Sequence, residues 1–264
     1  MHKRVRFAFV QLLHFGYQQA MSCLFPVAVF AVLALSKWNE MPVMPRYDWI
    51  LLLLVAVQVI LYLTGIETLD EIKVICVFHV IGLVLELYKV HMGSWSYPED
   101  GYTKLFGVPL YSGFMYASVA SYMCQVWRRL RMDMTGWPGM LPAAALGAAI
   151  YANFFTHHYV PDVRWWLTAL VFLVFWRTRI WYTVRERTYR MPLAAAFLLV
   201  GFFIWLAENI ATFFGAWTYP NQHEKWHMVG LGKMSSWFLL VIISVIIVAQ
   251  LKFVKAGRGK TNAV

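Results

Sequence analysis

Eight apolar runs of about twenty residues each restrict the folds that this chain can adopt. At about 1.5 Å per residue, such a run crosses the ~30 Å hydrocarbon core of a bilayer as one helix. The chain is 61% hydrophobic and 14% charged, whereas soluble domains are about 45–50% apolar. We therefore expect an all-α integral membrane protein with spans near residues 13–36, 48–66, 71–92, 106–127, 138–156, 163–182, 192–214 and 231–253.

Positive charges mark every second loop. Lysines and arginines gather at both ends of the chain, after the fourth span and after the sixth. The positive-inside rule makes those segments cytoplasmic, which places both termini inside and agrees with an even number of spans. We therefore attribute the formal net charge of +10 to membrane topology and expect no nucleic-acid partner.

One segment occurs twice. Glu86–Pro98 and Glu208–Pro220 both read Glu, six residues, Gly, any residue, Trp, any residue, Tyr-Pro, with an offset of 122 positions. In both copies a Gly and, five positions later, a Ser follow the segment (Gly107 and Ser112, Gly230 and Ser235). Such self-similarity indicates a repeat architecture. We expect one membrane domain, an eight-helix bundle built from duplicated four-helix halves at about residues 1–131 and 132–264.

The repeated glutamates are the first candidates for chemistry. A carboxyl group in hydrocarbon costs roughly 2.5–3.5 kcal/mol, so such groups usually face an interior and often mark function. Loss of water favours the neutral acid, which is a proton donor. We predict that Glu86 and Glu208 are catalytic acids, joined by His79 on nearly the same helical stripe. The alternative is a neutral Glu that holds the repeats in register.

Aromatic and small residues follow each glutamate. Trp95, Tyr97, Trp217 and Tyr219 are expected at the outer interface, where their rings can stabilise a cation, although Trp and Tyr gather at membrane interfaces in any case. Ser112 and Ser235 are predicted substrate contacts, and their small size also permits close helix packing.

Histidines concentrate in the expected outer loops. The segment HEKWH at residues 223–227 matches a zinc pattern in which His223 and His227 bind the metal and Glu224 is a base. Solvated loop histidines are the alternative, and we otherwise expect no cofactor. His157, His158 and Asp162 are candidates for a proton relay, while Asp162 also suits a helix cap.

The segment ELYKVHMGSWSYPEDGYTKLFGVPLYSGFMY, which starts at Glu86, resembles the bacterial carotenoid hydratases that act on bacterioruberin precursors and, more distantly, the small membrane lycopene cyclases. The whole chain, including HHYVPD and the second YPNQ, is most similar to the YoaT-like family of bacterial membrane proteins. The hydratase resemblance implies acid-initiated chemistry at an isoprenoid double bond, with Glu86 and Glu208 in the acid positions. A bacterial inner membrane is the location that the resemblance implies.

Three functions follow as hypotheses. The first is a membrane-embedded enzyme of isoprenoid or lipid metabolism, of the cyclase or hydratase type, whose site faces the outer side. Its partners would be the lipid bilayer and an apolar long-chain or isoprenoid ligand. The second is a zinc-dependent membrane hydrolase that uses HEKWH. The third is a transporter or binding protein for a small solute or lipid, because binding sites between repeats are common in carriers.

Overall fold

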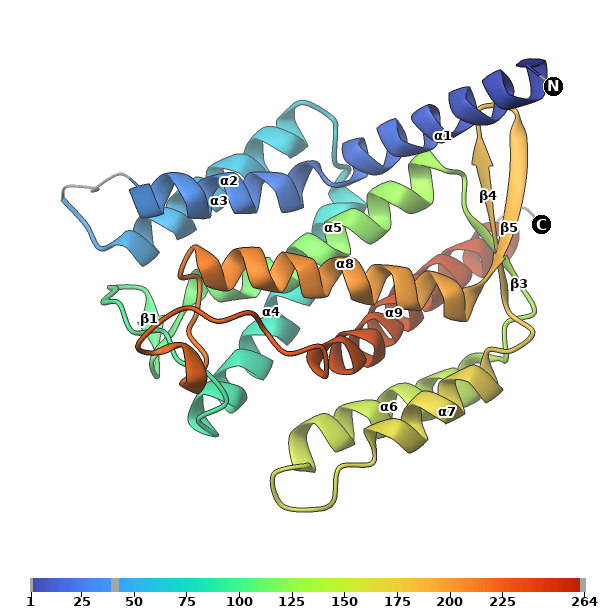
Figure 1. The fold of residues 1–264 in the computed structure, drawn as a ribbon. Helices are drawn as coiled ribbons and strands as arrows, with labels where there is room; N and C mark the ends of the chain where they lie inside the picture. The colour runs from blue at the N-terminus through green and yellow to red at the C-terminus, as the bar shows by residue number, and fades with distance from the viewer. Residues whose placement is uncertain (1, 39–42, 262–264) are drawn as a thin grey trace. The chain divides into compact units, whose positions relative to one another are not determined.

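The computed structural model describes residues 2–38 and 43–261, with side chains over 4–38 and 43–249, and it is mostly helical (Figure 1). The basic ends expected inside the cell lie partly outside these side chains. The helices are α1 (His2–Ser22), α2 (Leu24–Trp38), α3 (Arg46–Leu63), α4 (Leu69–His91), α5 (Gly113–Arg129), α6 (Met140–Thr156), α7 (Arg164–Val174), α8 (Leu193–Phe213) and α9 (Lys233–Thr261).

The chain divides into two compact units. Unit 1 comprises residues 1–18, 126–205 and 230–264, and unit 2 comprises residues 19–125 and 206–229. This division differs from the duplicated halves expected from the sequence, which stay a prediction. Unit 2 contains both copies of the repeated segment from each glutamate to its Tyr-Pro, so their geometry can be described within one unit.

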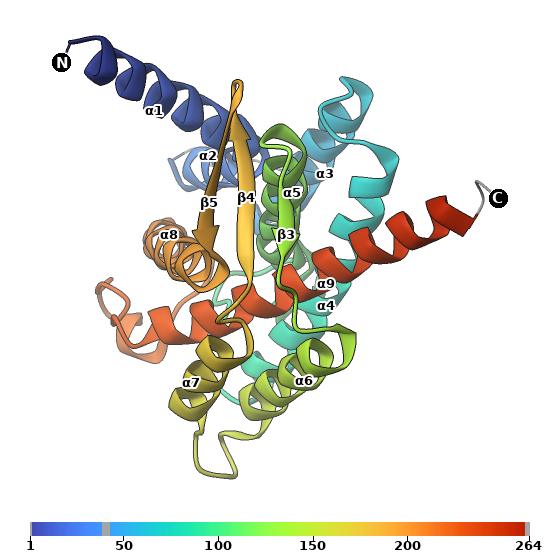
Figure 2. The ribbon, with the colours of Figure 1, turned by 90° about the vertical axis from the view of Figure 1, so that its right-hand side faces the viewer.

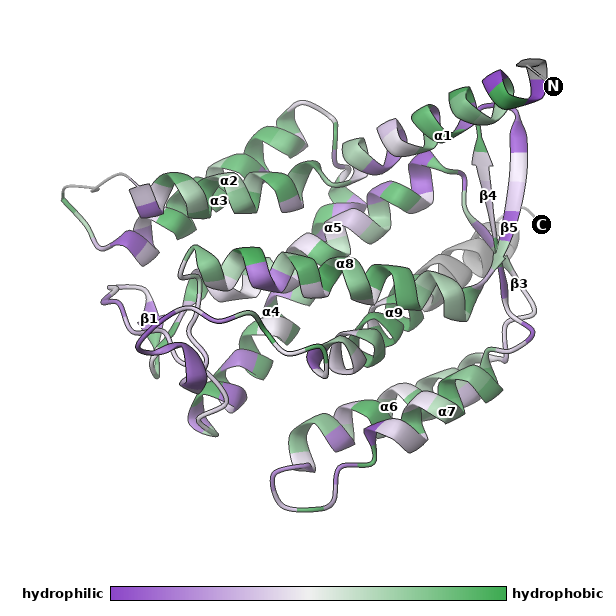
Figure 3. Cartoon of the chain, in the orientation of Figure 1, coloured by the Kyte–Doolittle hydropathy of each residue, from purple (hydrophilic) through white to green (hydrophobic). Residues whose placement is uncertain are grey.

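Several helices have the length and composition of membrane spans. Among the described residues, Arg46–Leu63 and Leu193–Phe213 are long and apolar enough to cross a bilayer, and α1 from Arg4 with α2 adds a third if this bent pair is one span. Helices α6, α7 and the part of α9 from Lys233 to Ala249 are apolar but shorter. Large apolar side chains are exposed on these helices, such as Leu63 and Leu173, and green, the colour of hydrophobic residues, is frequent along these helices in Figure 3. Such surface suits contact with lipid tails.

The first expected span, 13–36, is broken. Helices α1 and α2 meet at a bend of 60°, and Cys23 lies between them. Pro26 explains the break, because a proline ring collides with the carbonyl four residues earlier, here that of Ser22, and supplies no N–H to the helix. The run expected as one continuous span is therefore two helices.

The fourth expected span, 106–127, begins later than expected. Strands β1 (Lys104–Leu105) and β2 (Val108–Pro109) form a small antiparallel hairpin, followed by a 3-10 turn at Leu110–Ser112, and α5 starts only at Gly113. The two turn residues have positive φ angles, 49° at Phe106 and 84° at Gly107. This backbone conformation favours glycine at the second of them.

The sixth expected span, 163–182, is the largest error in the span predictions. Helix α7 ends at Val174, and the chain then forms β4 (Arg179–Val184) and β5 (Arg187–Pro192). With β3 (Asp133–Thr135) these strands make an antiparallel sheet in the order β3-β4-β5, which Figure 2 shows in unit 1. The sequence IWYTV from Ile180 is aromatic and β-branched, which favours a strand over a helix.

Each unit has its own core. In unit 2, Tyr47, Ile50 and Leu54 of α3 are fully buried together with Tyr111, and α2 packs along α3. In unit 1, α6, α7 and α9 pack on one another, and the rings of Phe175 and Phe197 meet edge to face at 5.9 Å. The C-terminal ends of α4 and α8, where the repeated glutamates lie, both belong to unit 2.

Candidate functional site: a glutamate and aromatic network

Glu86 is buried in α4 and accepts three hydrogen bonds. Its Oε2 receives the indole N–H of Trp95 at 2.7 Å and the hydroxyl of Tyr97 at 2.8 Å. Its Oε1 receives the hydroxyl of Tyr116 at 2.8 Å. Hydrogen bonds to a charged acceptor are stronger than neutral ones, so these three donors offset part of the cost of burying a negative charge on Glu86.

The turn after α4 brings Trp95 and Tyr97 back to the helix. Gly93 has a φ of 67°, the left-handed conformation that ends many helices, and the next N–H, that of Ser94, donates to the carbonyl of Lys89 at 2.9 Å. The chain therefore reverses its direction within two residues of the end of α4, the helix that carries Glu86. This turn explains the spacing of Glu, Gly, Trp and Tyr in the repeated segment.

Tyr116 reaches Glu86 from the neighbouring helix α5. Its ring lies against Gly82, one helical turn before Glu86, and a Cβ at position 82 would collide with that ring. Residues four apart share a helix face, so the glycine makes room for the ring whose hydroxyl binds the carboxylate. The site is therefore built by two helices as well as by the repeated segment.

Glu208 repeats part of this geometry in α8. It is buried, and the hydroxyl of Tyr219 donates to its Oε1, as Tyr97 donates to Glu86. The turn also repeats, because Gly215 has a φ of 69° and the N–H of Ala216 donates to the carbonyl of Ala211 at 3.0 Å. Trp217 is half-buried and hydrogen-bonds with Tyr219.

The two copies touch each other through equivalent residues. Ser96 and Thr218 form an isolated antiparallel bridge, and each backbone N–H donates to the other's carbonyl at 2.9 Å. Trp95 also packs edge to face on Tyr219 with ring centroids 5.9 Å apart. Trp95 thus contacts both the carboxylate of Glu86 and the tyrosine that binds Glu208, and the two networks form one cluster.

The loop tyrosines remain protonated. Burial raises the pKa of Tyr97 well above its ordinary value, and the nearby charge of Glu86 raises it further. Burial and Glu208 raise the pKa of Tyr219 in the same way, opposed by the hydrogen bond with Trp217. Both phenols therefore keep the proton with which they bind the glutamates.

Arg46, at the start of α3, connects the loops around this cluster. Its guanidinium pairs with Glu99 at 2.7 Å, and donates to the carbonyls of Phe214 at 2.6 Å and Gly215 at 3.3 Å, while its Nε donates to Ser36 at 3.1 Å. These carbonyls lie directly after the last residue of α8, at its C-terminal end, where a cation is favourable. Arg46 therefore binds the first repeat's loop to the turn of the second.

His79 and Ser112 also lie in unit 2, but outside the hydrogen-bond network of the two glutamates. The His79 ring packs on Phe114 at 4.6 Å and approaches Gly113. The Nδ1 of His79 and the Oγ of Ser112, a fully buried residue, have no hydrogen-bond partner among the residues that the structure describes. Their predicted roles in catalysis and in substrate binding stay predictions.

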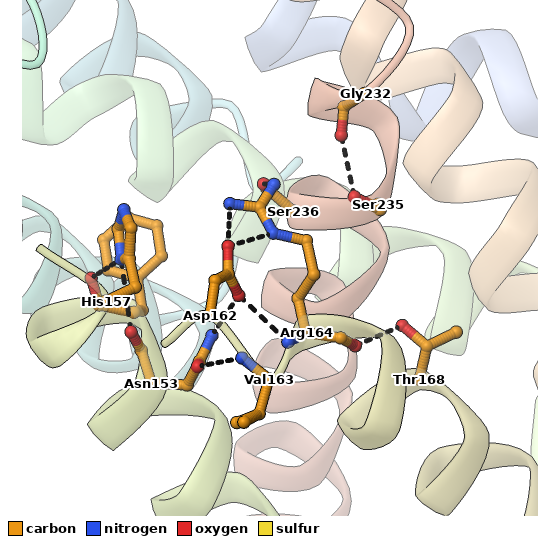
Figure 4. Close-up of polar contacts among 10 residues, drawn as sticks. Asn153, His157, Asp162, Val163, Arg164, Thr168, Gly232, Ser235 and Ser236 are labelled. Atoms are coloured by element: carbon orange, nitrogen blue, oxygen red, sulfur yellow. Dashed lines mark hydrogen bonds and ion pairs between the residues drawn. The ribbon is translucent and has the colours of Figure 1, made fainter. Parts of the chain in front are cut away.

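His157, His158, Asp162 and Ser235 lie in unit 1, where Figure 4 shows His157, Asp162 and Ser235, whereas His223 and His227 lie in unit 2. The rings of His157 and His158 are 4.2 Å apart, and the Nδ1 of His157 lies 3.0 Å from the carbonyl of Phe154. Asp162 pairs with Arg164 at 2.5 Å and accepts from Asn153 at 3.1 Å. The N–H of Arg164, the first residue of α7, also donates to Asp162 at 2.9 Å. The N-cap position of α7 is Val163 and has no side-chain cap bond, so the proton relay and the capping alternative for Asp162 both stay predictions.

Along the sequence, Ser235 and the HEKWH segment at residues 223–227 lie near the start of α9. Ser235 donates to the carbonyl of Gly232 at 2.7 Å, as Figure 4 also shows. His223 and His227 are exposed, and residues 223–229 form no helix that would align them. Across residues 2–38 and 43–261, no group of three or more His, Cys, Asp or Glu side chains could hold a metal ion. Zinc binding by His223 and His227 stays a prediction.

Sequence reasoning missed four residues of unit 2. Tyr116 has no counterpart in the repeat, because the residue 123 positions later, at the offset that relates Ser112 to Ser235, is Leu239, and Gly82 gave no signal. Arg46 was an ordinary loop cation. Glu67 is buried between α3 and α4 and accepts hydrogen bonds from Gln58 and Ser121. A buried Glu in a short polar loop is invisible without the tertiary contacts.

Comparison with known proteins gives a family and a relative. The family model described as "Protein of unknown function (DUF817)" matches residues 11–245. The "Uncharacterized protein YoaT" of Bacillus subtilis (strain 168) is 61% identical over 248 residues, 94% of each chain. The resemblance to YoaT-like proteins that the sequence suggested is thereby confirmed.

Among solved structures, the mycobacterial Insig homolog MvINS from Mycobacterium vanbaalenii is similar with a TM-score of 0.48 and 14% identity, over 68% of this chain and 92% of that one. A cross-linked trimer of MvINS matches over the same shares with a TM-score of 0.47.

Proposed function

The chain belongs to the DUF817 family of proteins of unknown function, and within this family we propose that it is a membrane-embedded enzyme that acts on an isoprenoid or other long-chain apolar lipid. Glu86 and Glu208 exchange protons with a carbon–carbon double bond of that lipid. The reaction is of the hydratase or cyclase type. The proposal gives the two repeated segments one shared chemical task.

One observation carries this proposal. Two glutamates from equivalent positions of a repeat are both buried, with 5% and 2% of their surfaces exposed, and their tyrosine and tryptophan partners meet between them. A purely structural glutamate needs no second copy beside it. Paired carboxyl groups in one site are a recurring arrangement for moving protons, and the bridge between Ser96 and Thr218 keeps this pair together.

The chemistry uses one carboxyl group as acid and one as base. The acid gives its proton to one alkene carbon, the electron pair of the double bond forms the new C–H bond, and the other carbon becomes a cation. The rings of Trp95 and Tyr219 are suited to stabilise that cation. The cation then loses a proton to a carboxylate, or a water oxygen binds it and the released proton returns to the carboxylate. Glu86, with three donors, is suited to be the carboxylate.

The test is untargeted mass spectrometry of apolar lipids. Wild type and the variant Glu86→Gln/Glu208→Gln are expressed at matched membrane levels in two hosts, one with and one without carotenoid precursors. We expect a species gained or lost by the mass of water, or an isomer with shifted retention, only with wild type. Glutamine keeps the shape and one accepting oxygen, but its amide nitrogen cannot accept a hydrogen bond and it has no transferable acid proton.

Glu224→Gln is the matched control, because Glu224 is an exposed glutamate of the HEKWH segment. It should leave the lipid product unchanged. Identical lipids from wild type and the double variant in both hosts would argue against the proposal. If Glu224→Gln alone abolished a product, the zinc hydrolase would replace it, and stoichiometric zinc in purified protein would be the next measurement.

A carrier is the second candidate, favoured by the break between α1 and α2. Carriers often bind substrates where a spanning helix is interrupted and its backbone groups are unpaired. Replacing Pro26 by Ala restores an N–H and removes the steric cause of the break, so Pro26→Ala should reduce solute flux in proteoliposomes. Flux that is abolished by Glu86→Gln would favour the carrier over the enzyme.

A further inference from the structure

The three-stranded sheet of unit 1 is tied to apolar helices at both ends of its hairpin. Strand β4 begins five residues after α7 ends at Val174, and β5 ends at Pro192, directly before α8 begins at Leu193. Residues 176–192 contain five arginines and one glutamate. Such a charged segment is too costly to place in hydrocarbon. Short connections to apolar helices therefore keep the sheet at the membrane surface.

The strand register divides the sheet into two faces. Ile180 opposes Met191, and Ile180 also opposes Met134 of β3, so these side chains share one face. Met134, Ile180 and Val184 are buried, and Tyr182 on that face packs on Phe15 of α1 at 5.8 Å. One face is thus covered by unit 1 itself.

The second face, which we call the open face, carries Arg179, Trp181 and Arg190. Trp181 opposes Arg190 across β4 and β5, and the Arg190 guanidinium lies over the Trp181 ring at 5.8 Å. The indole N–H of Trp181 donates to the hydroxyl of Thr135 at 2.8 Å, which fixes the ring. The acidic residue of this face is Asp133, which accepts from the N–H of Met134.

This arrangement matches the chemistry of a lipid phosphate. An arginine stacked on an aromatic ring keeps the planar edge of its guanidinium in position for two parallel bonds to phosphate oxygens. Tryptophan prefers the headgroup level of a bilayer, and clusters of basic residues next to spanning helices attract anionic lipids. Charge, aromatic anchor and position at the surface point to the same ligand.

We propose that the open face of the β3-β4-β5 sheet binds the phosphate headgroups of anionic phospholipids. Arg190 and Arg179 contact the phosphate, and Trp181 lies at the level of the glycerol backbone. The proposal is independent of the enzyme reaction, because it concerns unit 1 and no residue of the glutamate network. The ligand is a membrane lipid and not a soluble acidic protein.

The hairpin supplies its own matched pair of variants. Arg190 and Arg187 are both exposed, both lie over aromatic rings, and both belong to β5, but Arg187 lies on the covered face over Phe7 and Tyr189. Arg190→Gln and Arg187→Gln therefore remove the same charge from the same strand. A difference between them reports on the open face and not on net charge.

The experiment is native mass spectrometry of purified protein titrated with phosphatidylglycerol and, separately, with phosphatidylcholine. We expect wild type to retain phosphatidylglycerol preferentially, Arg190→Gln to bind it about fivefold more weakly, and Arg179→Gln/Arg190→Gln on the order of 25-fold more weakly. Arg187→Gln should bind as wild type does, and binding should weaken at high salt. Thermal unfolding checks that each variant is folded.

Equal retention of the two lipids by wild type, or equal loss in Arg190→Gln and Arg187→Gln, would overturn the proposal. If Arg190→Gln is poorly folded, Arg190→Lys decides: it keeps the charge but loses the planar fork, so it should bind phosphatidylglycerol measurably less tightly. Preferential binding of polyglutamate without any lipid preference would instead assign the open face to an acidic protein.

Discussion

Ser96 and Thr218 exchange two backbone hydrogen bonds, each 2.9 Å long, although 122 positions separate them in the chain. The same offset relates Glu86 to Glu208. Equivalent residues of the two copies are therefore bonded to each other. Such a reciprocal contact between equivalent positions is also found in the interface of a symmetric dimer, and here it joins the two segments that carry the glutamates.

This bridge depends on backbone groups and not on the serine side chain. Ser96→Pro removes the donor N–H and should lower the unfolding temperature in detergent, by the equivalent of at least ~1 kcal/mol, and reduce any lipid conversion. Ser96→Ala is the control. The Ser96 Oγ is buried and has no hydrogen-bond partner in the described part of the chain, so its removal should cost little. Equal effects of the two substitutions would show that the bridge has no importance.

Tyr116 should matter to Glu86 through its hydroxyl alone. Tyr116→Phe keeps the ring on Gly82 but removes one of three donors to the carboxylate, and hydrogen bonds to charged groups contribute about 1.5–3 kcal/mol. We expect lower lipid conversion with a shifted pH profile. Tyr122→Phe is the control, because Tyr122 lies in the same helix and bonds to Gln19 at 3.0 Å. A pH profile shifted equally by both variants would contradict this role.

Gly82→Ala tests the same contact from the opposite helix. The added methyl group collides with the Tyr116 ring, so the ring must move and its hydroxyl must leave Glu86. The double variant Gly82→Ala/Tyr116→Phe should then lose no more conversion than the more severe single variant, since both remove one hydrogen bond. Additive losses would mean that Gly82 acts on the fold in another way. Conversion and thermal unfolding of all three variants decide between these outcomes.

Arg46 should be irreplaceable by lysine. Its planar guanidinium serves Glu99, two carbonyls at the end of α8 and Ser36 at once, and a single ammonium group cannot reproduce that geometry. The pair with Glu99 is only partly buried, since 36% of the Glu99 side chain is exposed. The cost of Arg46→Lys therefore comes mainly from the lost bonds to the two carbonyls and should lower the unfolding temperature by the equivalent of ~1.5–3 kcal/mol. Lys73→Gln, which removes an exposed charge of α4, should not. Unfolding of Arg46→Lys at the wild-type temperature would exclude the connecting role.

The two glutamate turns were predictable from the sequence because the residues that contact one another recur at the same spacing in both copies of the repeat. Glu86, Trp95 and Tyr97 stand at fixed spacing, and the turn at Gly93 makes that spacing a contact. Apolar runs indicated most helices because they depend only on local composition. Tyr116 escaped detection because its contact with Glu86 spans 30 positions and has no second copy to reveal it.

The hairpin of β4 and β5 was not predicted from the sequence, for a different reason. Residues 163–182 have a hydropathy that suits a span, and hydropathy does not distinguish a buried strand from a helix over a short run. The arginines at positions 177 and 179 and the β-branched and aromatic residues that follow were the available signals. The sequence also suggested a proton relay of His157, His158 and Asp162; the structure pairs Asp162 with Arg164, and the relay stays a prediction.

Asp162 predicts how acid affects unit 1. Burial alone would raise the pKa of this carboxyl group, but hydrogen bonds from Arg164 and Asn153 and the arginine's charge lower it from 3.8 to about 2. A folded pKa below the unfolded one stabilises the fold above the unfolded value, and this contribution is lost as the pH falls through the folded value. The loss should therefore occur between about pH 4 and pH 2.

The variant Asp162→Asn removes this titration. At pH 7 it should unfold at a slightly lower temperature than wild type, by the equivalent of ~1 kcal/mol or less because the pair is partly exposed, and the difference should vanish by about pH 2. Glu186→Gln, at the exposed tip of the β4–β5 hairpin, is the control and should not reproduce this pattern. A difference for Asp162→Asn that persists unchanged at pH 2 would show that the bond to Arg164 stabilises the fold without its charge.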